Sequence, residues 1–328
     1  MNQKKQYITI VGMGHYGRNL IAPVYVLLPQ VRVKAIVSQH ATSETLEKTL
    51  LVGVPIVRSF KEWLRIFGEP TSEDIFDLCV HHQELPDLLK GLSEIGGKCC
   101  ILPKPVAVTQ KNWNAISRIN KKYEMRCAVA SQWYYSRLTK TLAISYKKLT
   151  QKTQANNIAM EFSQAFTDAQ LTHYSPTSGF LPHMLQILSS IGIPLAALGE
   201  RRITYKNLRY EISYAKPTPI HLVTNMGSKT LGAPQKVRRV RIFTAENLPV
   251  IDADFYAQCN NGQAIEENIL LTMTKKILAG LAEEILPFAE NHGVLSLENY
   301  WPIARELIAL NSLMTTPSVR EIVSGTDR

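Results

Sequence analysis

Three closely spaced glycines near the amino terminus are the first residues of this chain whose spacing points to specific chemistry. Gly12, Gly14 and Gly17 follow directly on the mostly apolar run 7–11. In a Gly-x-Gly-x-x-Gly turn the first glycine permits a sharp exit from a strand, the second lets backbone approach a pyrophosphate, and the third lets the next helix pack closely. The spacing therefore predicts a dinucleotide site that also includes His15 and Tyr16. A glycine-rich turn without a ligand is the alternative.

A lysine between two prolines is the second such feature. Lys104 lies between Pro103 and Pro105, just after the apolar run 98–102. Ligands of an open parallel sheet bind beyond the carboxyl ends of its strands, and the prolines restrict the backbone on both sides of the lysine. An ammonium group there could donate a proton, or stabilise negative charge, as hydride reaches a carbonyl or imine. A surface lysine in a proline-rich turn is the alternative.

The stretch after the second expected strand bears on the choice of cofactor. A site that prefers NAD usually presents Asp or Glu there to the adenine ribose, but here the first carboxylate is Glu44. Ser38, His40 and Thr42 could instead donate hydrogen bonds to a 2'-phosphate. NADP(H) is therefore favoured over NAD(H), although no arginine stands in this stretch.

Two adjacent histidines follow the fourth expected strand. By topology His81 and His82, with Gln83, are expected to border the ribose and nicotinamide. Side chains of neighbouring residues in an extended turn diverge, and no third ligand is evident. No metal site is therefore expected.

These residues need a scaffold that brings strand ends together, and residues 1–130 have the pattern of a parallel, doubly wound sheet. Strands are expected at 7–11, 31–37, 54–57, 75–80, 98–102 and 127–130. Helices are expected at 18–28 with a kink or early end at Pro23, and at 44–51, 59–67, 85–95 and 113–123.

Residues 131–328 have a different pattern, with half-exposed strands of alternating polarity. Antiparallel strands are expected at 157–166, 202–214, 221–225, 237–244 and 250–258, and helices at 138–149, 181–191, 266–286 and 297–310. The segment 226–235 is expected to be a mobile loop.

Composition limits the class of protein. A chain of 328 residues that is 45% hydrophobic can form two domains, expected at 1–130 and 131–328, and its apolar runs are too short to span a membrane. Five cysteines in mostly apolar runs indicate reduced core thiols and a cytoplasmic protein. The net charge of +10 comes from scattered basic residues, with Arg238, Arg239 and Arg241 spaced as in a half-exposed strand. An anionic small molecule is therefore a better partner than nucleic acid.

The glycine turn together with Lys104-Pro105 resembles the family of glucose-fructose oxidoreductase, inositol dehydrogenase and MocA, over nearly the whole chain. The resemblance implies an α/β protein: a Rossmann domain, then an α+β domain on an open-faced, mostly antiparallel sheet, with C-terminal helices that pack back. It also implies a nicotinamide cofactor and a homodimer or homotetramer formed through the second sheet.

The resemblance also implies a substrate-binding histidine, which corresponds to His183. Gly179 stands where the family has an aspartate, and Pro103 stands where it has a glutamate. Capping or packing is the alternative role for His183.

The aromatic segment 131–137 corresponds to the family's crossing into the second domain. In an extended segment the three adjacent aromatic side chains cannot share one core, so Tyr134 or Tyr135 is expected to offer a hydroxyl to the substrate. Gln132 is expected to bind the carboxamide of the cofactor, and packing between domains is the alternative.

The predicted function is an NAD(P)H-dependent oxidoreductase that transfers hydride between nicotinamide and a small carbonyl or imine. Lys104 would be the acid or electrostatic partner, and the missing aspartate favours reduction. An imine or thiazoline reductase of secondary metabolism is one alternative, and a non-catalytic, cofactor-binding regulator is another.

Overall fold

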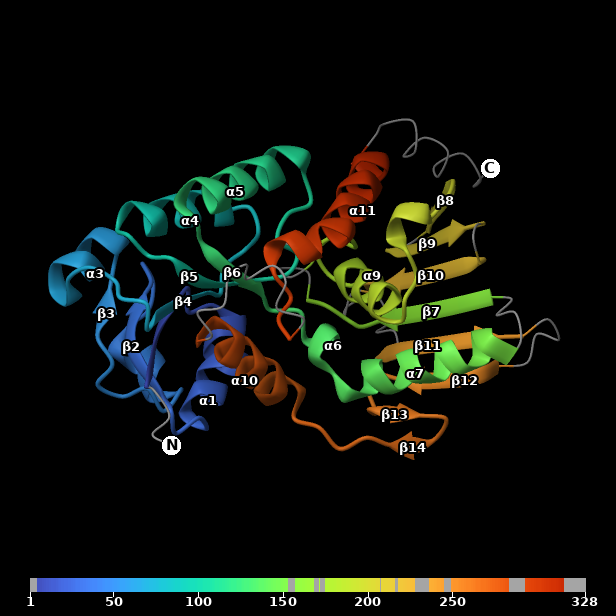
Figure 1. Cartoon of the computed structure of the whole chain (residues 1–328), viewed down its shortest axis with the longest axis horizontal. Coiled ribbons are helices and arrows are strands. Elements are labelled where there is room, and N and C mark those ends of the chain that lie inside the picture. The colour runs from blue at the N-terminus through green and yellow to red at the C-terminus, as the bar shows by residue number, and fades with distance from the viewer. Residues whose placement is uncertain are drawn as a thin grey trace. The chain divides into compact units, whose positions relative to one another are not determined.

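The computed structural model describes residues 5–152, 157–167, 171, 175–206, 208–215, 218–227, 236–244, 249–282 and 293–315. Its contacts divide the chain into two compact units (Figure 1). The first unit holds residues 1–132 and 268–304, and the second holds residues 133–267 and 305–328. The segment 268–304 therefore returns to the first unit after the chain has built the second.

The first unit contains a six-stranded parallel sheet with the strand order β3-β2-β1-β4-β5-β6. The strands are β1 (Gln6–Val11), β2 (Val31–Val37), β3 (Ile56–Val57), β4 (Asp74–Leu78), β5 (Cys99–Leu102) and β6 (Arg126–Val129). Order and direction are those of a doubly wound sheet, so the predicted Rossmann topology is confirmed.

Apolar runs form these strands because parallel strands are buried on both faces. Ile8 and Ile10 of β1 are fully buried, and Phe76 of β4 packs against Trp63 with ring centroids 5.2 Å apart. The Trp63 Nε1 atom donates a 3.0 Å hydrogen bond to Thr9 Oγ1, which satisfies two polar groups in the core.

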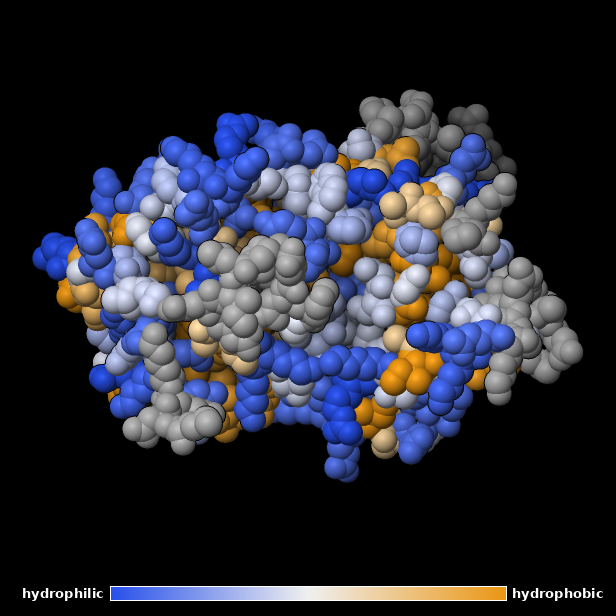
Figure 2. Space-filling model, viewed as in Figure 1, coloured by the Kyte–Doolittle hydropathy of each residue, from blue (hydrophilic) through white to orange (hydrophobic). Residues whose placement is uncertain are grey.

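The helices of the first unit begin at polar caps where the sequence provides them. The elements are η1 (Gly17–Ile21), α1 (Ala22–Val26), α2 (Ser43–Glu47), α3 (Phe60–Phe67), α4 (Leu85–Glu94), α5 (Gln110–Tyr123) and α10 (Ile269–Ala282). Thr42, Ser59 and Thr109 each accept a hydrogen bond from the backbone N–H three residues on, as N-caps do. The exposed polar side chains of α5 form a hydrophilic surface over that helix (Figure 2).

Two of the predicted helices differ in detail. The helix after the glycine turn begins with a π-helical stretch, η1, that ends at Ile21, and Pro23 lies in the first turn of α1, where its missing N–H is tolerated. The predicted helix 44–51 ends at Glu47 in the structure. The chain then turns through Leu50 and Gly53, which have φ angles of 62° and 80°.

The second unit contains an eight-stranded sheet with the order β14-β13-β12-β11-β7-β10-β9-β8. Its strands are β7 (Asn157–Ser163), β8 (Arg201–Lys206), β9 (Arg209–Tyr214), β10 (Ile220–Asn225), β11 (Val237–Phe243), β12 (Pro249–Asp254), β13 (Cys259–Asn260) and β14 (Gln263–Ala264). Only the β7–β10 pair among these is parallel, so the predicted mostly antiparallel sheet is confirmed.

Two predictions in this sheet are wrong. The single strand expected at 202–214 is a hairpin, β8 and β9, which turns at Leu208 with φ 64°. Polarity alternates on each side of this turn, with apolar residues at Ile203 and Tyr205 before it and at Tyr210 and Ile212 after it, so the two strands were taken together as one. The strand expected at 250–258 ends at Asp254, and a turn leads into the short hairpin of β13 and β14.

One face of the second sheet is apolar and covered by helices. Along β7, Ile158, Met160 and Phe162 are buried while the residues between them are mostly half-buried. The helices α7 (Arg137–Lys152) and α9 (Leu181–Ser190) lie on this inner face (Figure 1), and η2 (Leu195–Ala197) follows α9. The other face, the outer face, carries charged side chains such as Arg239 and Asp252.

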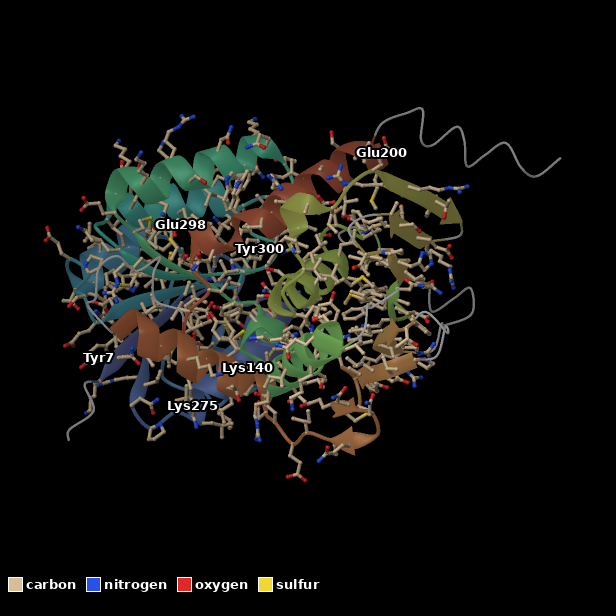
Figure 3. All side chains as sticks on the ribbon, turned by 45° about the vertical axis from the view of Figure 1, so that its right-hand side comes forward. Tyr7, Lys140, Glu200, Lys275, Glu298 and Tyr300 are labelled. Atoms are coloured by element: carbon tan, nitrogen blue, oxygen red, sulfur yellow. The ribbon has the colours of Figure 1, made fainter. Side chains whose placement is uncertain are left out.

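The helix α11 (Leu297–Thr315) contributes to each unit in turn. Its first part belongs to the first unit and includes Tyr300 (labelled in Figure 3), which is fully buried. In the same part, Trp301 stacks on Trp113 with ring centroids 4.8 Å apart. In the second unit, buried Glu306 accepts two 2.7 Å hydrogen bonds from Arg201 and one of 2.8 Å from Tyr214.

Three further expectations concern the chain as a whole. All five cysteines are free, and all but the half-buried Cys259 are buried, as expected of core thiols. Within the described part of the chain, no helix has both the length and the apolar character needed to cross a bilayer. Most of the loop expected at 226–235 lies outside the described residues.

Candidate functional site

The carboxyl edge of the first sheet brings together residues that are far apart in the sequence. In the order of the strands, Arg58 follows β3, Ser38 follows β2, Gly12 follows β1, His81 comes after β4 and Lys104 comes after β5. Neighbouring strands lie about 4.8 Å apart, so these residues form a row along one edge. The predicted cofactor residues stand on this row or beside it: Gly12, Gly14, His15, Tyr16, Gly17, Ser38, His40, His81, His82, Lys104, Pro105 and Gln132.

The three glycines of the turn differ in what surrounds them. Gly12 has φ 90°, and a Cβ there would lie 2.7 Å from the Cys79 carbonyl oxygen. A Cβ on Gly17 would lie 2.4 Å from the Gly12 carbonyl oxygen. A Cβ on Gly14 would meet no protein atom within 4 Å. The fold itself requires Gly12 and Gly17, whereas Gly14 keeps an exposed stretch of backbone open, as approach by a pyrophosphate requires.

His15 and Tyr16, in the middle of this turn, differ in exposure. His15 is exposed, and its Nδ1 lies 2.9 Å from Asn19 Nδ2. Burial, with Cys79 and Asp77 nearby, raises the pKa of Tyr16 well above its usual range. Tyr16 is half-buried, with Cys79 and Asp77 near its hydroxyl, and its expected contact with the cofactor stays a prediction.

A buried carboxylate beneath the turn was not predicted from the sequence. Asp77 of β4 is buried and accepts a 2.6 Å hydrogen bond from the hydroxyl of Tyr25 on α1. Burial raises the pKa of Asp77 to about 6, against the opposing effect of hydrogen bonds from Tyr25 and Cys79. This contact ties α1 to the strand beside the glycine turn. The signal in the sequence was an aspartate inside an otherwise apolar strand.

Arg58 completes the end of the row that was expected to bind the adenine ribose. Its Nη1 donates hydrogen bonds to the carbonyl oxygens of Ser38, Gln39 and Ala41 at 2.9, 3.0 and 2.9 Å. Ser38 Oγ accepts a 3.2 Å hydrogen bond from the Ala41 N–H, and His40 is exposed. The sequence placed no arginine here because Arg58 follows β3, and only the parallel pairing of β2 with β3 brings it to the end of β2.

His81 and His82 stack on each other, so the prediction that they diverge is wrong. Their ring centroids are 4.0 Å apart at an angle of 39°, which a tight turn after β4 allows and an extended segment would not. Burial, and secondarily His81, lowers the pKa of His82 to about 4, so His82 is neutral near pH 7. Among the described residues no group of three metal-ligating side chains occurs.

The remaining cofactor residues follow β5 and β6. Lys104 is half-buried, Pro105 is buried, and the peptide bond between them is cis. Gln132 is half-buried and begins α6 (Gln132–Tyr135), next to Ser131, whose buried Oγ has no hydrogen-bond partner among the described residues.

Residues 132–135 form a helical turn, so the extended segment expected there is wrong. Trp133 and Tyr135 are buried, and Tyr134 is half-buried with its ring 5.0 Å from that of Tyr135. Burial raises the pKa of Tyr134. Of the two predicted tyrosines, Tyr134 is the one with an accessible side chain.

His183 lies in an aromatic cluster of the second unit. We call Trp133, Phe162, Phe180, His183 and Phe255 the His183 cluster. The His183 ring lies 6.2 Å from Trp133 and 6.3 Å from Phe162, and Trp133 packs edge-on against Phe255 at 4.9 Å. Phe162 also contacts Phe180 at 6.2 Å. His183 is the third residue of α9 and only 7% exposed, so it is not a helix cap.

Gly179 lies in the turn that precedes α9. A Cβ there would lie 3.2 Å from the Ser175 carbonyl oxygen, so a side chain at this position would require the turn to adjust. An aspartate at this position, where the family resemblance expects one, would therefore require this turn to shift.

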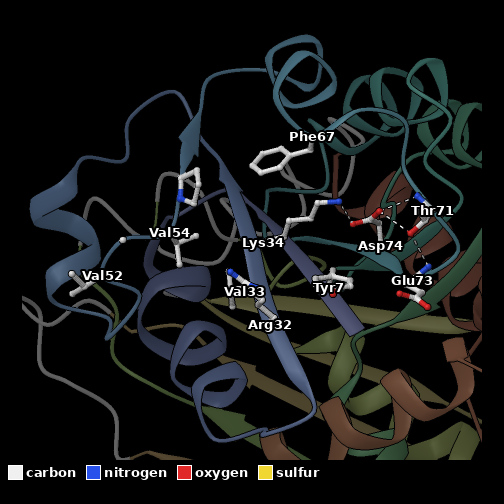
Figure 4. Close-up of a pocket in the computed structure, with 12 residues that line it drawn as sticks. Tyr7, Arg32, Val33, Lys34, Val52, Val54, Phe67, Thr71, Glu73 and Asp74 are labelled. Carbon is white, nitrogen blue, oxygen red and sulfur yellow. Dashed lines mark hydrogen bonds and ion pairs between the residues drawn. The ribbon is translucent and has the colours of Figure 1, made fainter. Parts of the chain in front are cut away.

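A separate pocket of about 650 Å³ lies at the amino edge of the first sheet (Figure 4). Lys34 there donates a 2.7 Å hydrogen bond to Asp74 and lies 4.7 Å from the Trp63 ring, and Thr71 satisfies the other Asp74 oxygen at 2.9 Å. These polar groups satisfy one another, and the predicted site residues lie elsewhere.

Comparisons with known proteins support the fold. No family model matches the chain, and no curated protein matches its sequence. Among solved structures, GenD2 from gentamicin A biosynthesis in complex with NAD has a TM-score of 0.72 at 12% identity, covering 95% of both chains.

Two further dehydrogenase structures are also similar. UDP-N-acetylglucosamine 3-dehydrogenase GnnA from Acidithiobacillus ferrooxidans has a TM-score of 0.69 at 13% identity, over 94% of this chain and 98% of that one. The WlbA dehydrogenase from Thermus thermophilus, in complex with NAD and UDP-GlcNAcA, has a TM-score of 0.68 at 10% identity over 95% of both chains. This chain therefore has the fold of the dehydrogenases of the glucose-fructose oxidoreductase, inositol dehydrogenase and MocA type, as its motifs predicted.

Proposed function

We propose that this protein is an NADP(H)-dependent oxidoreductase that transfers hydride between nicotinamide and a small carbonyl or imine compound. The observation that carries the proposal is the row along the carboxyl edge of the first sheet. It places an open glycine turn between a cation at one end, Arg58, and a proline-flanked lysine at the other, Lys104.

The glycine turn would hold the pyrophosphate of the cofactor. The backbone at Gly14 is open to solvent, and the helical turns that follow it begin with N–H groups that can bind phosphate oxygens. Asp77 and Tyr25 fix the helix beneath this turn, so the N–H groups are held in position before the ligand arrives.

Arg58 supports a preference for NADP(H). Within the described stretch 38–43 there is no carboxylate to repel a 2'-phosphate, and Arg58 holds that stretch through three carbonyl oxygens. The similar structures of GenD2 and WlbA contain NAD, so the comparison of the two cofactors needs a direct measurement.

Lys104 would supply the proton for reduction. When bound, a nicotinamide cofactor would supply the hydride that adds to the substrate carbon. Lys104 Nζ donates a proton to the substrate oxygen or nitrogen, and the resulting amine recovers a proton from solvent. His82 is neutral near pH 7, so it adds no competing positive charge to this edge.

In the second unit, His183 and Tyr134 would contact the substrate. Oxidation of a hydroxyl group needs a base oriented to remove its proton, and Gly179 cannot orient His183 as a carboxylate would. Reduction needs only the proton donor, so we propose that the enzyme works as a reductase. A sugar or sugar nucleotide is one carbonyl source to test, because GnnA and WlbA are associated with such compounds.

The outer face of the second sheet would carry a homo-oligomer. Arg209, Glu211, Ser213 and His221 form one polar network there, and Arg239 with Asp252 forms another. Both signs of charge are present, as a self-complementary interface requires. Analytical ultracentrifugation would distinguish a dimer or tetramer from a monomer.

Calorimetric titration with NADPH and NADH tests the cofactor assignment first. Binding of NADPH at least about tenfold tighter than NADH, a difference of about 1.4 kcal/mol, is expected. Loss of NADPH absorbance with a panel of carbonyl and imine compounds, including UDP-N-acetyl-3-keto sugars, then tests catalysis. No heat with either cofactor overturns the proposal. Cofactor binding without turnover of any compound favours the alternative of a non-catalytic, cofactor-binding regulator.

A further inference from the structure

Three arginines of β11 have different surroundings because side chains of a strand alternate between its two faces. Arg239 and Arg241 lie on the outer face. Arg239 binds Asp252 through two hydrogen bonds, of which the Nε–Oδ1 bond is 2.6 Å long, and Arg241 Nε lies 3.9 Å from the same carboxylate. Both outer arginines are thus near a negative charge.

Arg238 lies on the inner face, and its only side-chain hydrogen-bond partner among the described residues is neutral. Its Nη2 donates a 3.4 Å hydrogen bond to Gln164 Oε1, and its Nε is buried without a hydrogen-bond partner among the described residues. No described carboxylate forms an ion pair with it. Burial lowers the pKa of Arg238, and nearby Tyr256 opposes that shift. A half-buried guanidinium without a counter-charge is costly, so its presence requires an explanation.

The register of the sheet places Arg238 beside the His183 cluster. Arg238 pairs with Phe162 across β11 and β7, and directly paired residues share a face. Phe162 contacts the His183 ring at 6.3 Å. The backbone oxygen of Arg238 also accepts a 2.6 Å hydrogen bond from Phe255 N–H, and Phe255 packs on Trp133.

Other polar atoms around the same rings also have no partner among the described residues. Thr224, which pairs with Phe162 from the β10 side, is fully buried with an unpaired Oγ1. Gln186 lies one helical turn beyond His183 and has an unpaired Oε1. Trp133 has an unpaired Nε1. Buried polar groups are normally satisfied, so several unpaired ones around one cluster indicate a polar ligand.

We propose that Arg238 binds an oxyanion, a carboxylate or a phosphate, on the substrate of this enzyme. A guanidinium group presents a planar pair of N–H donors that matches such a group, and the bound anion would supply the missing counter-charge. The substrate is then an acidic compound, such as an oxo acid or a sugar phosphate, rather than a neutral sugar. This inference rests on the proposed function, because it assigns the charge of that enzyme's substrate.

Titration with small oxyanions tests the assignment without knowledge of the substrate. Inorganic phosphate and acetate are added separately to protein saturated with NADP⁺, which fills the glycine turn, and tryptophan fluorescence reports binding near Trp133. Phosphate, acetate or both are expected to bind saturably in the millimolar range. Arg238→Gln is expected to weaken that binding at least about tenfold. Arg239→Gln, on the outer face of the same strand, is the matched control and should leave it unchanged.

Thermal unfolding separates ligand binding from a structural role of Arg238. Without added oxyanion, Arg238→Gln is expected to unfold at the same temperature as the wild type or higher, because it removes an uncompensated charge. Phosphate or acetate should raise the unfolding temperature of the wild type and not of Arg238→Gln. Arg238→Lys, which keeps the charge without the planar donors, should recover part of the oxyanion affinity.

Three results would each overturn the assignment of an oxyanion site to Arg238. They are equal oxyanion affinity in the wild type and Arg238→Gln, no saturable binding of either oxyanion, and a lower unfolding temperature for both Arg238 variants. Calorimetry of NADP⁺ on the same proteins tests the proposed function separately. If NADP⁺ binds but Arg238→Gln leaves the oxyanion affinity unchanged, only the oxyanion site is rejected. If NADP⁺ does not bind, the cofactor assignment is rejected, and the oxyanion titration is then made on the free protein.

Discussion

Arg58 Nη1 donates a 2.9 Å hydrogen bond to the carbonyl oxygen of Ser38, although the two residues belong to different loops. Each follows a strand of the parallel sheet, Ser38 after β2 and Arg58 after β3, and these strands are neighbours. The contact fixes the loop that would receive the 2'-phosphate of NADP(H) and places a cation beside it. The arginine has other N–H donors that a phosphate could accept from.

Arg58→Gln is therefore expected to weaken NADPH binding by about 10- to 100-fold while NADH binding changes much less, because only NADPH carries the 2'-phosphate. Calorimetric titration of both cofactors measures the ratio. Arg65→Gln, an exposed arginine on α3, is the control and should change neither affinity. An equal loss for both cofactors would mean that Arg58 acts only by holding the loop.

The glycine turn predicts that two alanine substitutions two residues apart affect different properties, one the stability of the fold and the other the binding of NADPH. Gly12→Ala places a Cβ 2.7 Å from the Cys79 carbonyl oxygen at φ 90°, so it should lower the free energy of unfolding by about 1–3 kcal/mol. Gly14→Ala meets no protein atom within 4 Å and should leave thermal stability nearly unchanged. Its effect should appear instead as NADPH binding at least about tenfold weaker, because the methyl group occupies the space of the pyrophosphate. Normal NADPH affinity in a stable Gly14→Ala protein would place the cofactor elsewhere.

Lys104→Met is expected to lower kcat for carbonyl or imine reduction by about 100- to 10,000-fold, the range for loss of a positioned acid. NADPH affinity should fall much less, because the proposed contacts with the pyrophosphate and the adenine ribose follow β1, β2 and β3. Lys98→Met, which removes an exposed lysine just before β5, is the matched control and should retain full activity. Unchanged turnover in Lys104→Met would refute its role as acid.

Local signals in the sequence predicted the first sheet well. The strand expected at 31–37 is β2 without a change at either end, and the alternation of strands and helices correctly indicated a parallel sheet. The helix expected at 59–67 is α3 within one residue, whereas α5 begins at Gln110, three residues before its expected start, because Thr109 caps it. Such features are determined within a few residues and can be recognised without tertiary information.

Residues that act through tertiary contacts were harder to predict. Arg58 reaches the end of β2 only because β3 lies beside it, and Asp77 is recognisable as part of a buried network only with Tyr25 placed above it. The turn at Leu208 was missed because polarity alternates on both sides of it. In the sequence, Arg238 looks like Arg239 and Arg241, and only its pairing with Phe162 in the sheet shows that it lies on the inner face.

Asp77 makes the stability of the protein depend on pH in a direction opposite to that of an ion-paired carboxylate. Burial raises its pKa in the folded state to about 6, from 3.8 for an ordinary aspartate. Between about pH 4 and pH 6 the folded protein therefore binds more protons than the unfolded chain, and stability falls as the pH rises through this window. Above it both states are ionised and the cost of the buried charge is constant.

Asp77→Asn removes this titration. Relative to the wild type, the unfolding free energy of the variant should therefore rise by about 3 kcal/mol as the pH increases from 4 to 7.5. Urea unfolding across this range measures the difference. Asp87→Asn, at an exposed position on α4, is the control and should show no comparable shift. Tyr25→Phe removes the 2.6 Å hydrogen bond that favours the ionised carboxylate, so the fall in stability should extend to higher pH. The unfolding free energy of the wild type minus that of Asp77→Asn should fall between pH 4 and pH 6. A difference that stays flat or rises over this range would contradict a raised pKa of the buried Asp77.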